Sequence, residues 1–457
     1  MNAPVHRTVT DPKSAALFRF LRSDFDAASG VAALVYAFDN GPELIEKITF
    51  PDALSHLPAD REAAFQRALS TLHLIAGISY FKAAVPPAIH IDGAGIDLDT
   101  AMMLDEIYLH GLGEFAHQNR LDLRERIAFP AARNEAMRTL APALDLPRRT
   151  LVPIGGGKDS LLTVELLRQC SEPMTAVWVG SSALIQATAE RSGLPMLNLR
   201  REISPLLFEM NRNGAWNGHI PVTAINSAIL ACAAILYGFD AIAFSNERSA
   251  SSANLVHDGF AINHQWSKGL RFEEIFRAHL RTHVAANLDY FSALRSFSEL
   301  AVTSRFAKLE QYHTVFSSCN RNFKILGDRP ASRWCGACPK CHFVFLALAP
   351  FLPKARLLSI FGRNFLDDPN LTSAFDALLE VDAHKPFECV GEGRESRAAM
   401  AALATRAEWS EDVSVARFKH QVRPHLDPSE LDLAAQLRPG GPQHLPQRLL
   451  PILYAPG

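Results

Sequence analysis

The middle of the chain contains the run Gly155-Gly156-Gly157-Lys158-Asp159-Ser160, in which flexible backbone is followed by charge. Three successive glycines let the chain turn tightly and direct several N–H groups at one anion. A short apolar run, 150–154, comes before the turn and an amphipathic segment, 160–169, follows it, so a strand should lead through the turn into a helix. The N-terminal end of a helix favours phosphate, and Lys158 adds a cation. These residues predict a phosphate-binding loop.

The spacing within this loop excludes two common nucleotide-binding motifs. A Walker A loop would need glycine in place of Val152 and a hydroxyl residue in place of Asp159. A dinucleotide-binding fingerprint would need glycine in place of Ser160. The residues resemble instead the Ser-Gly-Gly-x-Asp-Ser loop of the N-type ATP pyrophosphatases, which adenylate an oxygen and release pyrophosphate, although Gly155 replaces the first serine. The resemblance implies ATP as a cosubstrate, with Asp159 either orienting Mg²⁺ or holding the loop.

A polar stretch, 245–268, provides a second group of candidate residues. Its first part follows the end of a predicted strand, which is where α/β sheets bind their ligands. We expect Ser245 and Asn246 to bind phosphate, Glu247 to bind Mg²⁺, and Arg248 and Ser249 to bind an anionic substrate. Any one of these residues taken alone is equally well explained as a solvated loop residue.

Several residues are candidates for proton transfer or for the substrate site. His264 and Lys268 are four positions apart, so they would share one face if their segment is helical. The neighbours His257 and Asp258 form a further acid/base candidate. Weaker candidates for substrate binding are His219, Glu114 and Arg394, and His219 is equally well explained as a structural histidine.

Four cysteines have a spacing that is typical of a zinc site. Cys335, Cys338 and Cys341 are three residues apart, and Cys319 precedes them. Four thiolates can surround Zn²⁺ tetrahedrally, and such a closed site is structural rather than catalytic. The cluster also resembles the zinc site of the 7-cyano-7-deazaguanine synthases. Buried free thiols, or His342 in place of one sulfur, are the alternatives.

The predicted elements place the loop and the polar stretch at one edge of a sheet. Strand-like runs at 150–154, 175–179, 196–199 and 241–244 alternate with helical patterns at 160–169, 182–192 and 222–237. This alternation predicts a parallel sheet with helices on both faces, and ligands bind beyond the carboxyl ends of its strands. The loops after Ile154 and Phe244 should therefore lie at the same edge.

The chain divides into three predicted parts. Residues 1–145 form an α+β domain, a candidate for substrate binding, with a hairpin of 31–38 and 43–50 and helices at 63–78 and 100–119. Residues 146–270 are expected to form an α/β domain, and the resemblance of its loop implies the PP-loop ATP pyrophosphatase type, which is adenine nucleotide alpha hydrolase-like. Residues 271–457 are helical up to 312, then carry the cysteines, and end in an extended proline-rich tail from Pro424.

Composition limits the partners of the protein. The chain has 457 residues, and its 46 lysines and arginines nearly balance 48 aspartates and glutamates, which argues against an obligate nucleic-acid binder. The apolar run 220–236 contains Thr223 and Asn226, and 343–352 is too short to span a bilayer, so no membrane partner is expected. Residues 1–7 contain no apolar core of a signal peptide, and the clustered cysteines suit a reducing compartment, which predicts the cytoplasm. The oligomeric state is left open.

Several segments together resemble one enzyme family, the ATP-dependent UDP-N-acetylmuramoyl-L-alanyl-L-glutamate epimerases of peptidoglycan synthesis. They are the loop at 155–160 and the segments 217–223, 245–249 and 263–268, with 77–80 and 111–115 in the N-terminal part. The resemblance implies that the terminal L-glutamate of the nucleotide-linked dipeptide is converted to D-glutamate while ATP becomes AMP and pyrophosphate. Adenylation would remove the charge of the α-carboxylate, so that an acid/base group can take the neighbouring proton.

Three other functions share some of these features. An adenylating ligase like the deazaguanine synthases has the loop and the cysteines, but it does not account for the long N-terminal part. An RNA-thiolating enzyme would bind RNA tightly, which the near-zero net charge disfavours. A nucleotide-binding regulatory module would bind ATP without chemistry.

Overall fold

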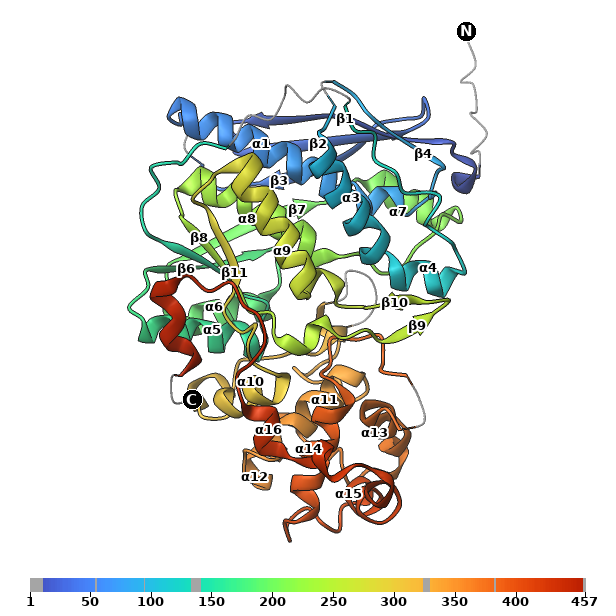
Figure 1. Cartoon of the computed structure of the whole chain (residues 1–457), viewed down its shortest axis with the longest axis vertical. Helices are drawn as coiled ribbons and strands as arrows, with labels where there is room; N and C mark the ends of the chain where they lie inside the picture. The colour runs from blue at the N-terminus through green and yellow to red at the C-terminus, as the bar shows by residue number, and fades with distance from the viewer. Residues whose placement is uncertain are drawn as a thin grey trace. The chain divides into compact units, whose positions relative to one another are not determined.

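The computed structural model describes residues 11–53, 56–93, 95–132, 141–323, 329–381 and 384–454 (Figure 1). Contacts divide the chain into a first unit of residues 1–145, 199–238 and 278–287 and a second unit of residues 146–198, 239–277 and 288–457. Two later segments of the chain thus belong to the first unit, and the glycine loop and the cysteines share the second. The predicted lack of a signal peptide concerns residues outside the described ones.

A sheet of mostly antiparallel strands forms one layer of the first unit. Its strands, in spatial order, are β7 (Met196–Glu202), β3 (Leu44–Thr49), β2 (Val31–Phe38), β1 (Leu17–Asp26) and β4 (Ala88–Ile91). Only the β1–β4 pair is parallel. The predicted β2–β3 hairpin is confirmed, and Asp39 adopts a φ of +49° in its turn. β1 and β4 were not predicted, and β7 begins in the second unit and continues into the first.

The helices of the first unit enclose an aromatic core. They are α1 (Ala59–Ala76), α2 (Ile78–Phe81), α3 (Leu98–Gly111), α4 (Gly113–Asn119), α7 (Pro205–Arg212) and α8 (Val222–Tyr237). The helices predicted at 63–78, 100–119 and 222–237 are confirmed, and α8 ends at Gly238 with a φ of +74°. The ring of Tyr36 lies 4.8 Å from those of His73 and Tyr80, and α1 packs against both β1 and α8.

The second unit contains the predicted parallel sheet. Its order is β11 (Asp289–Ser292), β8 (Ala241–Phe244), β5 (Thr150–Pro153) and β6 (Met174–Val179), and each neighbouring pair is parallel. The helices α5 (Lys158–Gln169) and α6 (Ala183–Ser192) follow β5 and β6, as predicted. A continuous helical region over 271–312 was wrong at β11, because this four-residue strand is too short for its periodicity to reveal it and is stabilised by pairing with β8.

The remaining elements of the second unit are mostly helices. They are α9 (Leu270–His279, whose last two residues belong to the first unit), α10 (Glu299–Phe306), α11 (Pro339–Leu348), α12 (Lys354–Phe361), α13 (Thr372–Leu379), α14 (Gly393–Ala404), α15 (Val413–Arg417) and α16 (Leu433–Leu437). A two-stranded ribbon, β9 (Leu255–His257) and β10 (Phe260–Ile262), precedes them.

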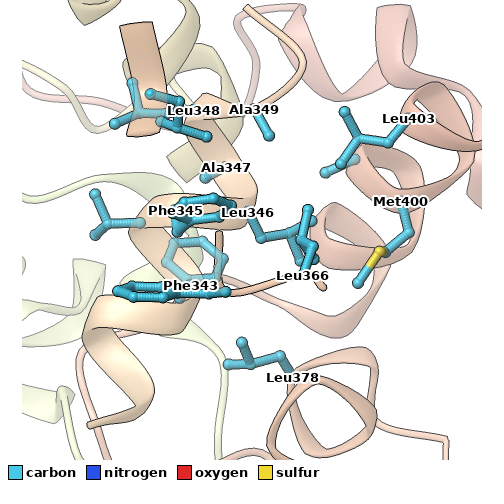
Figure 2. Packing of buried hydrophobic residues seen from close by; sticks show 14 of the residues in the cluster. Phe343, Phe345, Leu346, Ala347, Leu348, Ala349, Leu366, Leu378, Met400 and Leu403 are labelled. Atoms are coloured by element: carbon cyan, nitrogen blue, oxygen red, sulfur yellow. The ribbon is translucent and has the colours of Figure 1, made fainter. Parts of the chain in front are cut away.

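The C-terminal helices have a core of their own (Figure 2). Phe345 and Leu346 of α11 point toward Leu366, and Met400 and Leu403 of α14 approach from the other side. The tail from Pro424 is not extended throughout, because it contains α16 and a 3₁₀ helix, Gln447–Leu453, whose Leu449 is fully buried. Within the described ranges, every helix is too short or too polar to cross a bilayer.

Candidate functional site

Three loops of the second unit leave the sheet at the same edge. β5, β8 and β11 are adjacent and parallel, so the chain that follows each of them emerges beside the others. The first loop leads into α5, the second carries the polar residues from Ser245 onward, and the third leads to Glu299 at the start of α10. The two loops that the sequence predicted to be neighbours therefore are neighbours, and a third joins them.

The glycine loop has a conformation that favours glycine at Gly156 and leaves little room beside Gly157. Gly156 has a φ of +83°, which favours glycine, and a Cβ on Gly157 would lie 2.8 Å from the hydroxyl oxygen of Ser318. The backbone N–H of Ser317 donates to the Gly156 carbonyl at 2.9 Å. α5 begins directly after Gly157, whose lack of a side chain leaves the start of the helix without a side-chain cap. This arrangement suits an external anion as the cap.

Lys158, the first residue of α5, is buried in a group of charged side chains. Its ammonium group contacts the carboxylates of Asp159 and Glu299. Glu299 also accepts a hydrogen bond from Lys340 of α11, at 3.1 Å. We call Lys158, Asp159, Glu247, Glu299 and Lys340 the lysine–carboxylate cluster, because the charges of all five influence one another.

The protonation of this cluster follows from competition between burial and charge. Burial alone would raise the pKa of Glu299, but Lys158 and Lys340 hold that pKa well below its usual range. Burial alone would lower the pKa of Lys158, but Asp159 and Glu299 raise it. The pKa of Glu247 is raised, first by burial and then by the charges of Glu299 and Asp159. The site therefore holds charged lysines beside Glu247, whose carboxylate is not fully neutralised by them.

The residues after β8 have unequal surroundings. The hydroxyl of Ser245 is buried and finds no hydrogen-bond partner within the described part of the chain. The carbonyl of Asn246 accepts a hydrogen bond from Ser292 at 2.5 Å, and that of Glu247 accepts one from Arg295 at 3.0 Å. Ser249 accepts a hydrogen bond from the backbone N–H of Glu299 at 3.2 Å and so supports α10. Ser245 is thus the residue of this loop with an unused polar group.

The backbone of Arg248 is fixed, and its side chain lies near the tail of the chain. Its N–H donates to the Phe297 carbonyl at 2.8 Å. A Cβ on Gly440 would lie 3.3 Å from the Arg248 guanidinium. Arg248 therefore belongs to the region after β8, and its guanidinium lies against Gly440.

His264 and Lys268 do not share a helix face, because their segment is a turn followed by a 3₁₀ helix over Trp266–Lys268. They nevertheless meet at one atom, the sulfur of Cys389. The ammonium group of Lys268 lies 3.2 Å from it, and His264 also hydrogen-bonds to it. The polar stretch thus brings two predicted residues together at a cysteine that the sequence did not indicate.

The other acid/base pair lies on an exposed turn. His257 and Asp258 form the tip of the β9–β10 ribbon, where Asp258 has a φ of +50° and their side chains are 61% and 78% exposed. A group that removes a carbon-bound proton works best where water is excluded. Arg394, in the first turn of α14, is half-exposed and contacts Glu392.

Two predicted substrate residues belong to the first unit. Glu114 is buried at the start of α4, and one of its oxygens lies 3.8 Å from a ring nitrogen of His219. Gln118 donates to its other oxygen at 2.9 Å. Lys82 donates to the side chain of Asn217, which is close to His219 in the chain, at 2.7 Å, and burial lowers the pKa of Lys82 to about 8. The first unit therefore has a polar group of its own around 217–219.

The four cysteines lie together in the second unit. All four sulfurs lie within 4.8 Å of one another, and Cys341 is 3.4 Å from Cys338 and 3.8 Å from Cys335. Sulfurs bound tetrahedrally to zinc at about 2.3 Å are separated by about 3.8 Å, so the donor set fits this ion. One ring nitrogen of His342 instead lies 3.1 Å from the Gly336 carbonyl. The cluster lies at the start of α11, so it also fixes Lys340.

Glu299, Lys340 and Cys389 were missed by sequence reasoning. Glu299 looks like an ordinary acidic residue in a first helical turn, and Lys340 is concealed between two cysteines. Cys389 stands apart from the cysteine spacing that indicated a metal site. The position of Lys340 within the cysteine run was the only usable signal, since a metal site fixes the residues between its ligands.

Comparisons with known proteins cover nearly the whole chain. Residues 9–293 match the MurL N-terminal domain, and residues 315–432 match the MurL C-terminal domain. A UDP-N-acetyl-alpha-D-muramoyl-L-alanyl-L-glutamate epimerase of Xanthomonas oryzae pv. oryzae is 56% identical over 439 residues, which are 96% of this chain and 97% of the relative. Epimerases of the same name from Salinispora tropica and a Micromonospora species are 40% and 41% identical, each over 94% of this chain and over 94% and 96% of their own.

Proposed function

Because the chain belongs to the MurL family, we propose that it epimerises the terminal L-glutamate of UDP-N-acetylmuramoyl-L-alanyl-L-glutamate to D-glutamate in peptidoglycan precursor synthesis. We further propose that the second unit is a PP-loop ATP pyrophosphatase domain that adenylates the α-carboxylate of this glutamate. The proposal places the protein in the cytoplasm, where ATP and nucleotide-linked precursors are available. The first unit, with Glu114 and His219, would bind part of the dipeptide substrate.

The observation that carries the ATP-dependent step is the buried Lys158 at the start of α5. A lysine at an uncapped helix N-terminus, after a loop in which Gly156 has a left-handed φ, is suited to a polyphosphate. Its charge is balanced by Asp159 and Glu299 without nucleotide. Phosphate groups would compete for this lysine, while Ser160 and the unpaired hydroxyl of Ser245 would donate hydrogen bonds.

The carboxylates of the cluster fit Mg²⁺. Asp159 and Glu247 offer the oxygen ligands that this ion prefers, and the raised pKa of Glu247 reflects burial beside other negative groups. A divalent cation would relieve this repulsion and would neutralise charge on the phosphates when bound. Asp159 and Glu247 would hold it.

Adenylation makes the proton chemistry feasible. A free carboxylate opposes removal of the neighbouring proton, because a second negative charge would develop beside the first. The acyl-adenylate carries no charge at that position, and its carbonyl can delocalise the electron pair of the broken C–H bond. ATP would thus be consumed to acidify one proton, and water would then hydrolyse the acyl-adenylate.

We propose that the cysteine cluster holds a structural zinc ion, since its sulfur separations fit tetrahedral coordination. Cys319, Cys335, Cys338 and Cys341 would be the ligands. Metal analysis of the purified protein should find about one zinc per chain. Cys338→Ser should lose this zinc, whereas Cys232→Ser, which alters a buried cysteine of α8, should retain it. Zinc binding that persists in Cys338→Ser would contradict this assignment.

The function is tested by following three products. With ATP and the L-glutamate dipeptide, the protein should release AMP and pyrophosphate, exchange labelled pyrophosphate into ATP, and form a D-glutamate product with solvent deuterium at the α-carbon. Product formation that requires ammonia or another amine would indicate a ligase. A complete lack of AMP would indicate a binding module.

A further inference from the structure

Cys389 lies on a segment that the polar stretch holds in place. Asn254 donates to the Pro386 carbonyl at 2.6 Å, and Gln265 donates to the Val390 carbonyl at 3.2 Å. On the other side, a Cβ on Gly391 would lie 2.6 Å from the Phe343 ring, so the segment lies tightly against α11. These contacts fix the position of the Cys389 sulfur.

Positive groups surround this sulfur. Lys268 lies 3.2 Å away, His264 hydrogen-bonds to it, and the charge of Lys340 also acts on it. Burial alone would raise the pKa of Cys389, but these three groups lower it to about 5. The residue as a whole is only partly buried.

The sulfur is electrostatically linked to the lysine–carboxylate cluster. Lys340 binds Glu299 at 3.1 Å and also acts on Cys389. Lys268 likewise interacts with Cys389 and with Glu247. In an acyl-adenylate, the α-carbon is bonded to the acyl carbon, which is one oxygen away from phosphorus. A base for the α-proton must therefore lie close to the phosphate site, and Lys268 and Lys340 link Cys389 electrostatically to the cluster beside that site.

We propose that Cys389 is the catalytic base that removes the α-proton, an inference that rests on the proposed function. The thiolate takes the proton, an S–H bond forms as the C–H bond breaks, and the electron pair moves to the acyl oxygen. Water donates a proton to the opposite face of the planar carbon. The hydroxide that remains takes the proton of the thiol, so the thiolate and the water are restored.

Lys268 and His264 act through Cys389 as positioning residues. Their contacts keep the sulfur deprotonated and oriented, and neither needs to touch the substrate. The other cysteines lack this environment. Cys319, Cys335, Cys338 and Cys341 form the proposed metal site, and burial raises the pKa values of Cys170 and Cys232.

The first experiment separates proton transfer from adenylation in the full-length protein. Cys389→Ser should exchange labelled pyrophosphate into ATP within about threefold of the wild type, while α-deuterium incorporation falls by at least about 10³-fold. Cys170→Ser, which alters a half-buried cysteine outside the site, is the matched control and should retain both. Deuterium incorporation within tenfold of the wild type, or loss of both reactions, would overturn the role of Cys389. Lack of pyrophosphate exchange in the wild type would refute the proposed function instead.

The second experiment tests the positioning residues by pH dependence. A thiolate with a pKa of about 5 is deprotonated above that pH, so wild-type deuterium incorporation should decline only below about pH 5. Lys268→Met should move this decline upward by at least about one pH unit, because a positive charge beside the sulfur is lost. The midpoint should stay below the ordinary thiol value, because His264 and Lys340 remain. Lys268→Arg should restore the low midpoint. An unchanged midpoint in Lys268→Met would show that this lysine does not act through the sulfur.

Discussion

Glu46 and Arg201 in the first unit and Lys158 and Glu299 in the second are both buried ion pairs, but their surroundings differ. Arg201 donates to the two oxygens of Glu46 at 2.8 and 3.1 Å and to the hydroxyl of Ser79 at 2.9 Å. One cation therefore meets one anion. In the second unit, two lysines share a space with three carboxylates, and the pKa of Glu247 is raised there.

The difference separates a structural pair from the proposed binding site. A buried pair in which both carboxylate oxygens accept hydrogen bonds from the same guanidinium connects β7 to β3, which is a structural role. A crowded group of two lysines and three carboxylates can bind an anion at its lysines and a cation at its carboxylates. Variants of the Glu46–Arg201 pair should therefore lose stability, whereas variants of the lysine–carboxylate cluster should lose activity.

The largest effect is expected from Lys158→Met. The exchange of pyrophosphate into ATP should fall by at least about 10³-fold, or about 4 kcal/mol in the activation free energy, because the cation at the phosphates is lost. Thermal unfolding should change little, since Lys340 still neutralises Glu299. Exchange that stays within tenfold of the wild type would remove Lys158 from the ATP site.

The converse is expected from Arg201→Met. This variant leaves Glu46 buried and unpaired, so the free energy of unfolding measured in urea should fall by about 3–5 kcal/mol. Pyrophosphate exchange per folded molecule should remain within twofold of the wild type. The double variant Glu46→Leu, Arg201→Met is the control, and it should recover much of the lost stability because no unpaired charge remains. A destabilised double variant would show that the ion pair itself is required.

A smaller effect concerns the buried histidines of the first unit. His73 lies 3.0 Å from the Val35 carbonyl, and burial lowers its pKa to about 4, below the ordinary value of 6.5. The unfolded state therefore binds the extra proton first as the pH falls. The contribution to stability is full above pH 6.5 and should decline by about 2 kcal/mol between pH 6.5 and 5. His73→Gln should flatten this dependence in urea unfolding, and an unchanged slope would assign it to other groups such as His279, whose pKa is lowered to about 3.

The smallest effect should come from an exposed pair. Arg22 donates to Glu43 at 2.7 and 2.9 Å, which is as close as the buried pairs, but solvent screens both groups. Glu43→Gln should leave the urea midpoint unchanged within error. A clear loss of stability would show that an exposed ion pair contributes like the buried Glu46–Arg201 pair, so that burial is not what makes that pair structural.

The sequence was informative where function depends on neighbouring residues. The strand, turn and helix around Gly155–Ser160 are local, so glycine chemistry and periodicity were sufficient to predict them. Glu299 and Cys389 reach their partners through folding of distant segments, 141 residues from Lys158 and 121 from Lys268. Such contacts leave no periodic pattern. The same limit explains β11, whose partner strand β8 lies well upstream in the chain.

Contacts of the glycine loop connect it to the proposed zinc site. Ser317 donates to the carbonyl of Gly156, and Ser318 lies beside Gly157. The next residue, Cys319, is a proposed zinc ligand. Lys340 lies between two further ligands, so the metal would hold both sides of the nucleotide site. A zinc-starved cell would then make an enzyme with weaker ATP affinity although every residue expected to contact phosphate is intact. Such an enzyme would match the synthesis of D-glutamate precursors to the zinc status of the cell.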